Sequence, residues 1–151
     1  MSAAPLSRWL TALLLSVWTG EAVAQQAPSE PASRSTLLGL PLSDAPRRLT
    51  SGAGYVAEIA QMNKGALSWT LGPCRRYELL YWTTALKVQP SVALAHFKAA
   101  VHAAGWKQTT VADFTPLGGL EAFVLSKDGR RVLASVVLGR GPSLSLCELP
   151  R

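Results

Sequence analysis

The residues EAFVLSKDGRRVLASVVL, 121–138, decide the fold of this chain. Two runs rich in apolar and β-branched residues, Glu121–Lys127 and Arg131–Leu138, stand on either side of Asp128-Gly129. A two-residue type I′ turn needs positive φ at both central positions, which Asp and Gly tolerate better than most residues. The stretch therefore predicts a tight β-hairpin and, around it, an antiparallel sheet.

The segments that flank the hairpin extend this sheet. Gly139–Pro142 contains turn residues, and the segment Ser143–Leu149 after it predicts a last strand. Before the hairpin, Trp106–Thr115 predicts another strand, which reaches the hairpin through the loop Pro116–Gly119. Because short turns join strands that are neighbours in a sheet, we expect antiparallel pairing throughout this half of the chain.

The strongest helix signal lies at Ser91–Ala104. Ser91 is a favourable N-cap, and Gly105 can adopt the left-handed conformation in which many helices end. One helical stripe is apolar and is expected to pack on the sheet; its residues are Leu94, Phe97, Val101 and Ala104.

The first half of the chain predicts further strands. Arg76–Val88 carries apolar or aromatic residues on both faces, which is typical of a central strand. Gly54–Gln61 and Ala66–Leu71 predict a hairpin across a turn at 62–65, and Leu38–Leu42 predicts an edge or covering segment. The expected fold class is therefore α+β: a curved, mostly antiparallel sheet in the order ββ-β-α-ββββ with one main helix.

This arrangement resembles that of small exported bacterial domains of unknown function, in which a strand and a helix ending in Gly-Trp precede antiparallel hairpins. The residues that carry the resemblance are Tyr77–Val88, Ser91–Ala104, Gly105-Trp106 and the turn at Asp128-Gly129. These residues form the fold, so the resemblance implies an α+β architecture and no site residues.

The N-terminal segment predicts a secretory signal peptide over residues 1–24. Met1–Arg8 supplies a short basic region, Trp9–Trp18 an apolar core, and Ala22–Ala24 a small-x-small cleavage site. Cleavage is expected between Ala24 and Gln25. The alternative is an uncleaved anchor, but the apolar run has only about half of the residues that a membrane-spanning helix needs. We expect export by the general secretory route to the periplasm or the exterior, with no transmembrane segment after cleavage.

The mature chain is expected to contain one folded domain. Residues 25–36 are rich in Pro, Ser, Ala and Gln and show no apolar periodicity, which predicts a disordered leader. The single α+β domain is then expected at residues 37–151.

The chain has two cysteines, Cys74 and Cys147, which predict a disulfide in an oxidising compartment. The alternative is a catalytic thiol. Neither cysteine lies in a C-x-x-C unit or another nucleophile motif, so the disulfide is favoured.

The net charge of +6 favours anionic partners. An aromatic and cationic groove for an anionic envelope polymer or glycan could be formed by Arg75, Arg76, Arg130 and Arg131 with Trp82 or Trp106. The alternative is that the arginines form a solvated surface with no dedicated partner and the tryptophans pack in the core. The absence of a long Lys/Arg run and the expected export both argue against cytosolic nucleic acid.

The sequence contains no recognised catalytic motif. His96 and His102 are six residues apart, which places them about 120° apart around a helix axis and disfavours a shared metal. H-E-x-x-H, G-x-S-x-G and phosphate-binding loops are absent, so no cofactor or metal is expected. We expect a non-enzymatic binding or structural role in the cell envelope or outside the cell, with an anionic polymer or another envelope protein as partner. A small hydrolase with a site assembled across strands stays open as the alternative.

Overall fold

The hairpin at Asp128-Gly129 is confirmed in the computed structural model, which describes residues 28–83, 89–111, 120–139 and 141–151. Both turn residues have positive φ, 49° at Asp128 and 72° at Gly129, as a type I′ turn requires. Lys127 and Arg130 close the turn as register partners. The rest of the sheet is built outward from this pair.

In the described part of the chain, seven strands form one antiparallel sheet in the order β1-β2-β3-β7-β6-β5-β4. The last strand of the chain therefore lies at the centre, and β1 and β4 lie at the two edges. The elements are β1 (Ser29–Pro31), β2 (Arg47–Leu49), α2 (Ala53–Ser68), β3 (Arg76–Tyr81), α3 (Pro90–Ala103), β4 (Lys107–Thr110), β5 (Leu120–Lys127), β6 (Arg130–Val137) and β7 (Ser143–Glu148). The α+β class and the antiparallel pairing are confirmed.

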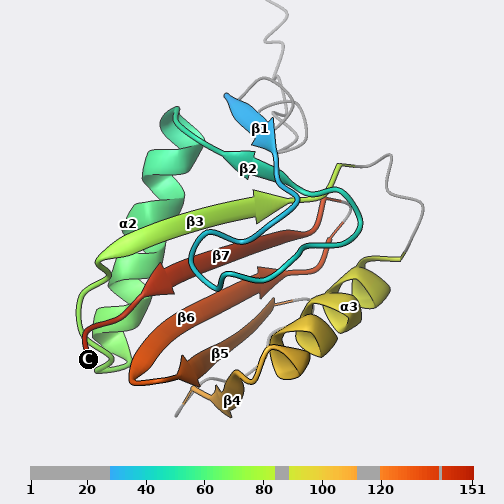
Figure 1. Ribbon diagram of the computed structural model, residues 1–151. Helices are drawn as coiled ribbons and strands as arrows, with labels where there is room; N and C mark the ends of the chain where they lie inside the picture. Colours follow the sequence, from blue (N-terminus) through green and yellow to red (C-terminus); the bar gives the residue numbers. More distant parts are fainter. Residues whose placement is uncertain (1–27, 84–88, 112–119, 140) are drawn as a thin grey trace, which may run out of the picture.

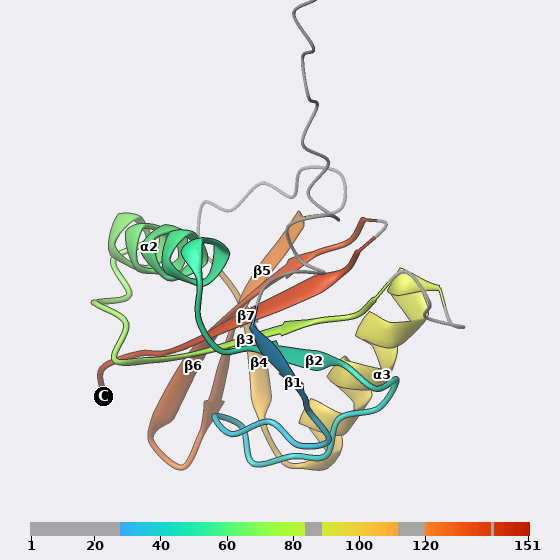
Figure 2. The same ribbon diagram turned by 90° about the horizontal axis from the view of Figure 1, so that it is seen from above.

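The sheet carries one helix on each face (Figure 1, Figure 2). α2 covers one face, and α3 covers the other beside the loop 32–46, which we call the strap. Because side chains alternate between the two faces of a strand, each face has its own apolar cluster. Phe97 and Phe123 belong to the cluster under α3 and the strap, whereas Met62 and Leu133 belong to the cluster under α2.

The hairpin predicted over residues 54–71 is wrong, because these residues form the helix α2 and the turn that ends it. Met62 and Ala66 are four residues apart and are both buried on the sheet, which is the spacing of a helix face. The helix ends in a Schellman motif: the N–H of Leu71 donates to the carbonyl of Ala66 at 2.9 Å, and Thr70 has a φ of 56°. The fold therefore has a second helix that the sequence prediction lacked.

The helix α3 is confirmed and spans Pro90–Ala103, one residue earlier at each end than predicted, with Gln89 as its N-cap. It begins at Pro90 and not after an N-cap at Ser91, because proline is well suited to the first helical position. At the other end, Gly105 has a φ of 81°, and the N–H of Trp106 donates to the carbonyl of Val101 at 3.1 Å. Gly105 thus ends the helix as predicted.

Two predicted strands are shorter in the structure. β3 ends at Tyr81, Trp82 and Thr83 follow it without strand structure, and residues 84–88 of the predicted range lie outside the described residues. β4 ends at Thr110, and residues 112–115 of its predicted range also lie outside them.

The described part of the fold already begins at β1, before the expected start at Leu37. β1 pairs with β2, and the strap that follows buries Ala32 and Ser35. Leu38 and Leu40 are buried as well, so the predicted segment Leu38–Leu42 covers the sheet as part of the strap.

A buried carboxylate holds the strap on the sheet. Glu78 on β3 is 2% exposed, and its Oε2 accepts hydrogen bonds from the Ser35 hydroxyl at 2.7 Å and the Leu37 N–H at 3.1 Å. Its Oε1 accepts from the Thr36 N–H at 3.0 Å and from Arg48 Nη2 at 2.7 Å. Burial by itself raises the pKa of this carboxyl, but the hydrogen bonds outweigh burial and hold the pKa below its usual value.

Candidate functional site

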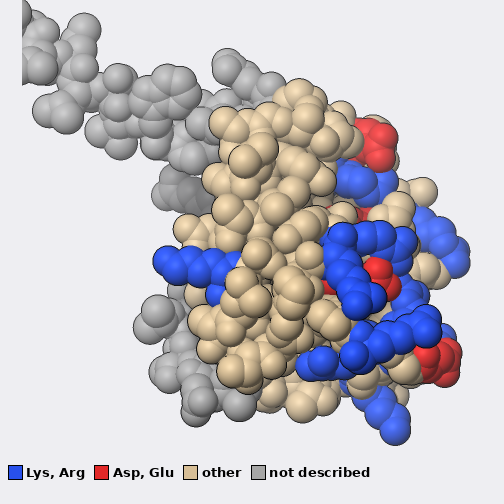
Figure 3. Space-filling model, turned by 90° about the vertical axis from the view of Figure 1, so that its left-hand side faces the viewer, with Lys and Arg blue, Asp and Glu red and all other residues tan. Residues whose placement is uncertain are grey.

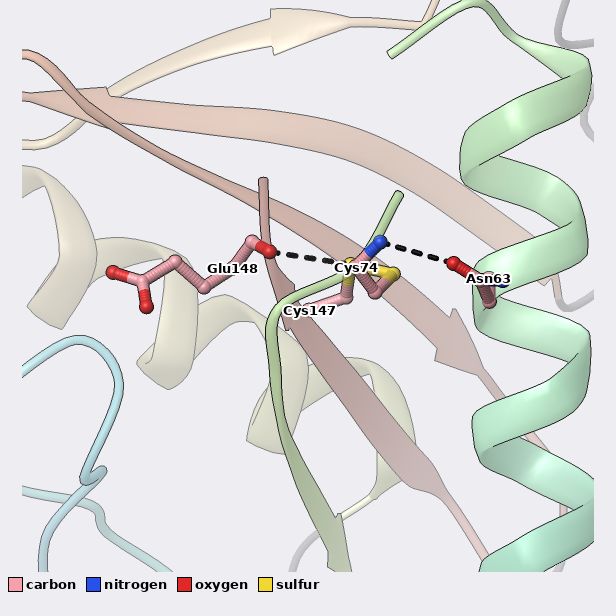
Figure 4. Close-up of a disulfide and its surroundings, with 4 residues drawn as sticks. All are labelled: Asn63, Cys74, Cys147 and Glu148. Atoms are coloured by element: carbon pink, nitrogen blue, oxygen red, sulfur yellow. Dashed lines mark hydrogen bonds between the residues drawn. A yellow bond between two sulfur atoms is a disulfide. The ribbon is translucent and has the colours of Figure 1, made fainter. Parts of the chain in front are cut away.

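The predicted disulfide is present and positions the first arginine pair. Cys74 and Cys147 are bonded, with their Cα atoms 5.5 Å apart, and they link the chain just before β3 to the central strand β7. The Cys74 N–H also donates to Asn63 Oδ1 of α2 at 3.0 Å, as Figure 4 shows. The start of β3 is therefore fixed to the sheet and to α2, and Arg75 and Arg76 follow it directly.

Arg75 and Arg76 both lie opposite one residue of β7, as in a β-bulge. Arg76 is the register partner of Glu148, and the N–H of Arg75 donates to the Glu148 carbonyl at 2.9 Å. The extra residue shifts the alternation of faces by one position. Cys74 consequently lies on the α2 face together with Cys147, where both contact the same apolar cluster.

The carboxylate of Glu148 joins the two predicted arginine pairs. It accepts a hydrogen bond from Arg76 Nε at 2.6 Å and from Arg130 Nη2 at 3.2 Å. The hydrogen bond from Arg76, together with the two positive charges, holds the pKa of Glu148 below its usual value. Arg76 keeps 59% of its side chain exposed, so its guanidinium can still reach a ligand.

Arg130 ties three parts of the fold together. Besides Glu148, its Nη2 donates to the carbonyl of Leu37 in the strap at 2.8 Å. Its guanidinium also lies over the ring of Trp106, 5.6 Å from the centroid. Trp106 is 4% exposed, so it supports Arg130 from below and has little surface for a ligand.

Two other cations at this end of the sheet behave differently. Among the described residues the Arg75 side chain has no hydrogen-bonding or ionic partner, and Arg75 is exposed. Arg131 lies on the face that α2 covers, because it is two residues before Leu133 on the same strand. The structure thus brings Arg75, Arg76 and Arg130 together around Glu148 and places Arg131 across the sheet from them.

Lys127 adds a further cation beside Arg130, its partner across the hairpin. Its Nζ donates to the carbonyl of Ala104 at 2.5 Å, at the C-terminal end of α3, where a positive charge is favourable. We call the set Arg75, Arg76, Lys127, Arg130, Arg131 and Glu148 the basic end. Figure 3 faces the side of the molecule where β3 begins and β7 ends, and it shows Lys and Arg gathered along one margin with few acidic residues between them.

Trp82 does not belong to the predicted groove. It follows β3 directly, so it lies about 20 Å along the strand from Arg76 at a rise of ~3.3 Å per residue. It is 5% exposed and packs in the cluster under α3. The structure therefore places Trp82 in the core and away from the arginines, whereas Trp106, the other tryptophan of the prediction, lies under Arg130.

The histidines and carboxylates of the described residues form no metal site. His96 pairs through Nδ1 with Asp44 Oδ2 at 2.9 Å, His102 is exposed, and no group of three or more His, Cys, Asp or Glu in the described ranges could hold a metal ion. None of the helices in that part of the chain has the length and hydropathy to cross a membrane. The predicted cleavage residues Ala24 and Gln25 lie outside the described residues.

Replacing Arg130 with alanine is expected to lower the free energy of unfolding by about 2 kcal/mol, because the Leu37 carbonyl loses its partner and Trp106 loses its cation. Arg75→Ala, which removes an unpaired and exposed arginine, is the matched control and should change stability by less than about 0.5 kcal/mol. Urea unfolding of both variants measures the difference. Equal stability of the two variants would show that Arg130 does not hold the strap.

The basic end thus combines an exposed cationic surface with an internal ion-pair network. Comparisons with protein-family models, with curated proteins and with solved structures found no match to this chain.

Proposed function

We propose that this protein is an exported, non-enzymatic binding module whose basic end binds an anionic polymer of the cell envelope or the exterior. The observation that carries the proposal is the charge at this end. Arg76 and Arg130 pair with Glu148, Arg75 lies beside them, and two further cations, Lys127 and Arg131, flank the hairpin turn that carries Asp128. An excess of positive charge of this kind attracts polyanions. The fold does not require a cation at every one of these positions.

The contacts divide the basic end into supporting and binding residues. Arg130 and Lys127 hold the strap and α3 through backbone carbonyls, so their positive charges are present but their donors are partly used. Arg75 and Arg76 are exposed, and Arg76 donates one hydrogen bond to Glu148. We assign the principal ligand contacts to Arg75 and Arg76, whose guanidinium groups suit sulfate, phosphate and carboxylate oxygens.

Export is the second part of the proposal. It rests on the sequence of residues 1–24, which has the features of a secretory signal, and it is compatible with the disulfide between Cys74 and Cys147. N-terminal sequencing of protein recovered outside the cytoplasm tests it. A mature chain that starts at Gln25 supports export, and intact Met1 in that material contradicts cleavage.

Retention on dextran sulfate agarose, with neutral dextran agarose as the reference, tests polymer binding. We expect the protein to bind at low ionic strength and to elute as salt rises, because binding releases counterions. Arg75→Gln should elute earlier, and the slope of log affinity against log salt should fall by about 0.7–0.9, the value for one lost contact.

Lys64→Gln is the matched control for this experiment. Lys64 is exposed on α2, across the sheet from Glu148, so its replacement removes the same charge from another surface. If the two substitutions weaken retention equally, retention depends only on the net charge of the protein. That result would contradict a site at the basic end. Lack of retention at low salt would contradict polymer binding altogether.

A further inference from the structure

The outer edge of β4 is open in the described part of the chain. β4 is the last strand in the sheet order, and no described strand pairs with its outer side. All four of its residues are exposed. An edge of this kind presents unpaired backbone groups that another extended chain can use.

The hairpin between β5 and β6 determines which backbone groups point outward. In its two-residue turn the carbonyl of Lys127 faces the N–H of Arg130, so this pair is hydrogen-bonded. Hydrogen-bonded and non-bonded pairs alternate along an antiparallel ladder. The next residue, Arg131, points the other way, because its carbonyl accepts from the N–H of Leu149 beyond β7 at 2.9 Å.

The same alternation applies to β5 and passes through it to β4. In β5, Ser126 and Val124 alternate with the residues that hydrogen-bond to β6, so their backbone N–H and C=O groups point toward β4. Their register partners on β4 are Lys107 and Thr109. Gln108 and Thr110 are the remaining residues of the strand. Their N–H and C=O groups consequently face outward, away from β5.

A hollow runs beside this edge, between β4 and α3. Its volume is about 510 Å³, and its floor is formed by the buried residues Val101 and Trp106. The polar residues that line it are Lys98, His102, Lys107 and Gln108, with no Asp or Glu among the lining residues. The Lys98 ammonium is paired with Glu121, whereas Lys107 has no ionic partner among the described residues.

We infer that the outer edge of β4 binds an acidic peptide segment in an extended conformation, which joins the sheet as an additional strand. Gln108 and Thr110 supply the backbone hydrogen bonds. The Lys107 side chain projects from the face of β4 opposite to Trp106, and Lys98 lies at the hollow, so cations flank the edge and favour carboxylates on the side chains of the peptide. The Lys107 charge also disfavours a second copy of this chain, because pairing β4 with itself brings two Lys107 side chains together.

Amide hydrogen exchange, measured with a capped peptide in which Glu and Val alternate, tests this inference. In the free protein the Gln108 and Thr110 amides should exchange faster than those of Lys107 and Thr109. Saturating peptide should slow the exchange at Gln108 and Thr110 by about tenfold or more, since each amide gains a hydrogen bond. Gln108→Pro removes one outward N–H at an edge position that accepts proline, so it should weaken peptide binding about tenfold.

Four results would overturn the inference. Two concern exchange: the Gln108 and Thr110 amides exchange at an unchanged rate with peptide bound, or all four β4 amides exchange equally slowly in the free protein. Two concern affinity: a peptide in which Lys replaces Glu binds equally well, or Gln108→Pro binds the peptide with full affinity. If Gln108→Pro does not fold, two peptides replace it, each N-methylated at every second residue but starting one residue apart. Only the peptide whose methyl groups point away from β4 should bind. Arg75→Gln should bind the acidic peptide as the unaltered protein does, which separates this edge from the basic end.

Discussion

Replacing Glu78 with alanine is expected to lower the free energy of unfolding by about 3–5 kcal/mol, the range for removing one partner of a buried ion pair. The substitution leaves the backbone N–H groups of Thr36 and Leu37 without an acceptor. It also leaves Arg48 with only the exposed Glu30 and the Arg34 carbonyl as partners. The strap should detach from β3 as a result. Urea unfolding with the disulfide intact measures the loss.

Glu30→Gln is the matched control for Glu78→Ala. Glu30 pairs with the same Arg48 at 2.8 Å, but its side chain is 56% exposed. Exposed ion pairs contribute little, so the control should lose less than about 1 kcal/mol. Similar losses in both variants would contradict the role of Glu78 as the buried anchor of the strap.

The stability of the protein should also depend on pH through Glu78 and Glu148. Both carboxyls have pKa values in the folded protein below the ordinary value of 4.5. Their stabilising contribution is therefore complete above that value and is lost as the pH falls through the folded-state pKa values. In Glu78→Gln the drop in unfolding free energy below pH 4.5 should be smaller than in the unaltered protein.

Removal of the disulfide is the second large effect that we expect. Cys74 and Cys147 are 73 residues apart, and in the chain-entropy model closure of such a loop stabilises the fold by about 4 kcal/mol. The double variant Cys74→Ala/Cys147→Ala should lose a similar amount, measured by urea unfolding. Reductant should not change the unfolding free energy of this variant. It should lower that of the unaltered protein to about the value of the variant. A loss below about 1 kcal/mol would show that the contacts of this segment with α2 and β7 hold it in place without the disulfide.

The second half of the fold was predictable because its local signals agree with its tertiary contacts. Asp128-Gly129 favours one turn type, and the strands on either side pair in the expected antiparallel sense. Gly105 marks the end of α3 in the same way, since glycine readily adopts the positive φ that a Schellman motif needs.

The helix α2 was missed because its local signals are weak or misleading. It contains Gly54 and Gly65, and the residue with positive φ after it is Thr70 in place of glycine. Packing explains Gly65: a Cβ atom there would lie 3.3 Å from the ring of Trp69. The spacing of Met62 and Ala66 matches a helix face, but the alternation of apolar and polar residues before Leu71 favoured a strand.

The candidate site was predictable in composition but not in arrangement. Adjacent residues of a strand point to opposite faces, which separates Arg130 from Arg131. Arg75 and Arg76 stay together only because both lie opposite Glu148, and this pairing depends on the position of the last strand. The length of β3 separates Trp82 from the basic end. These are long-range relations that no local pattern contains.

Binding of an anionic polymer through the basic end is tested most directly by mapping amide chemical shifts during titration with dextran sulfate oligomers at low salt. We predict that the largest shifts occur at Arg75, Arg76, Arg130 and Glu148 and that they collapse at high ionic strength. Shifts that are absent at low salt, or that are largest on α2 or at the N-terminal end of α3, would contradict it.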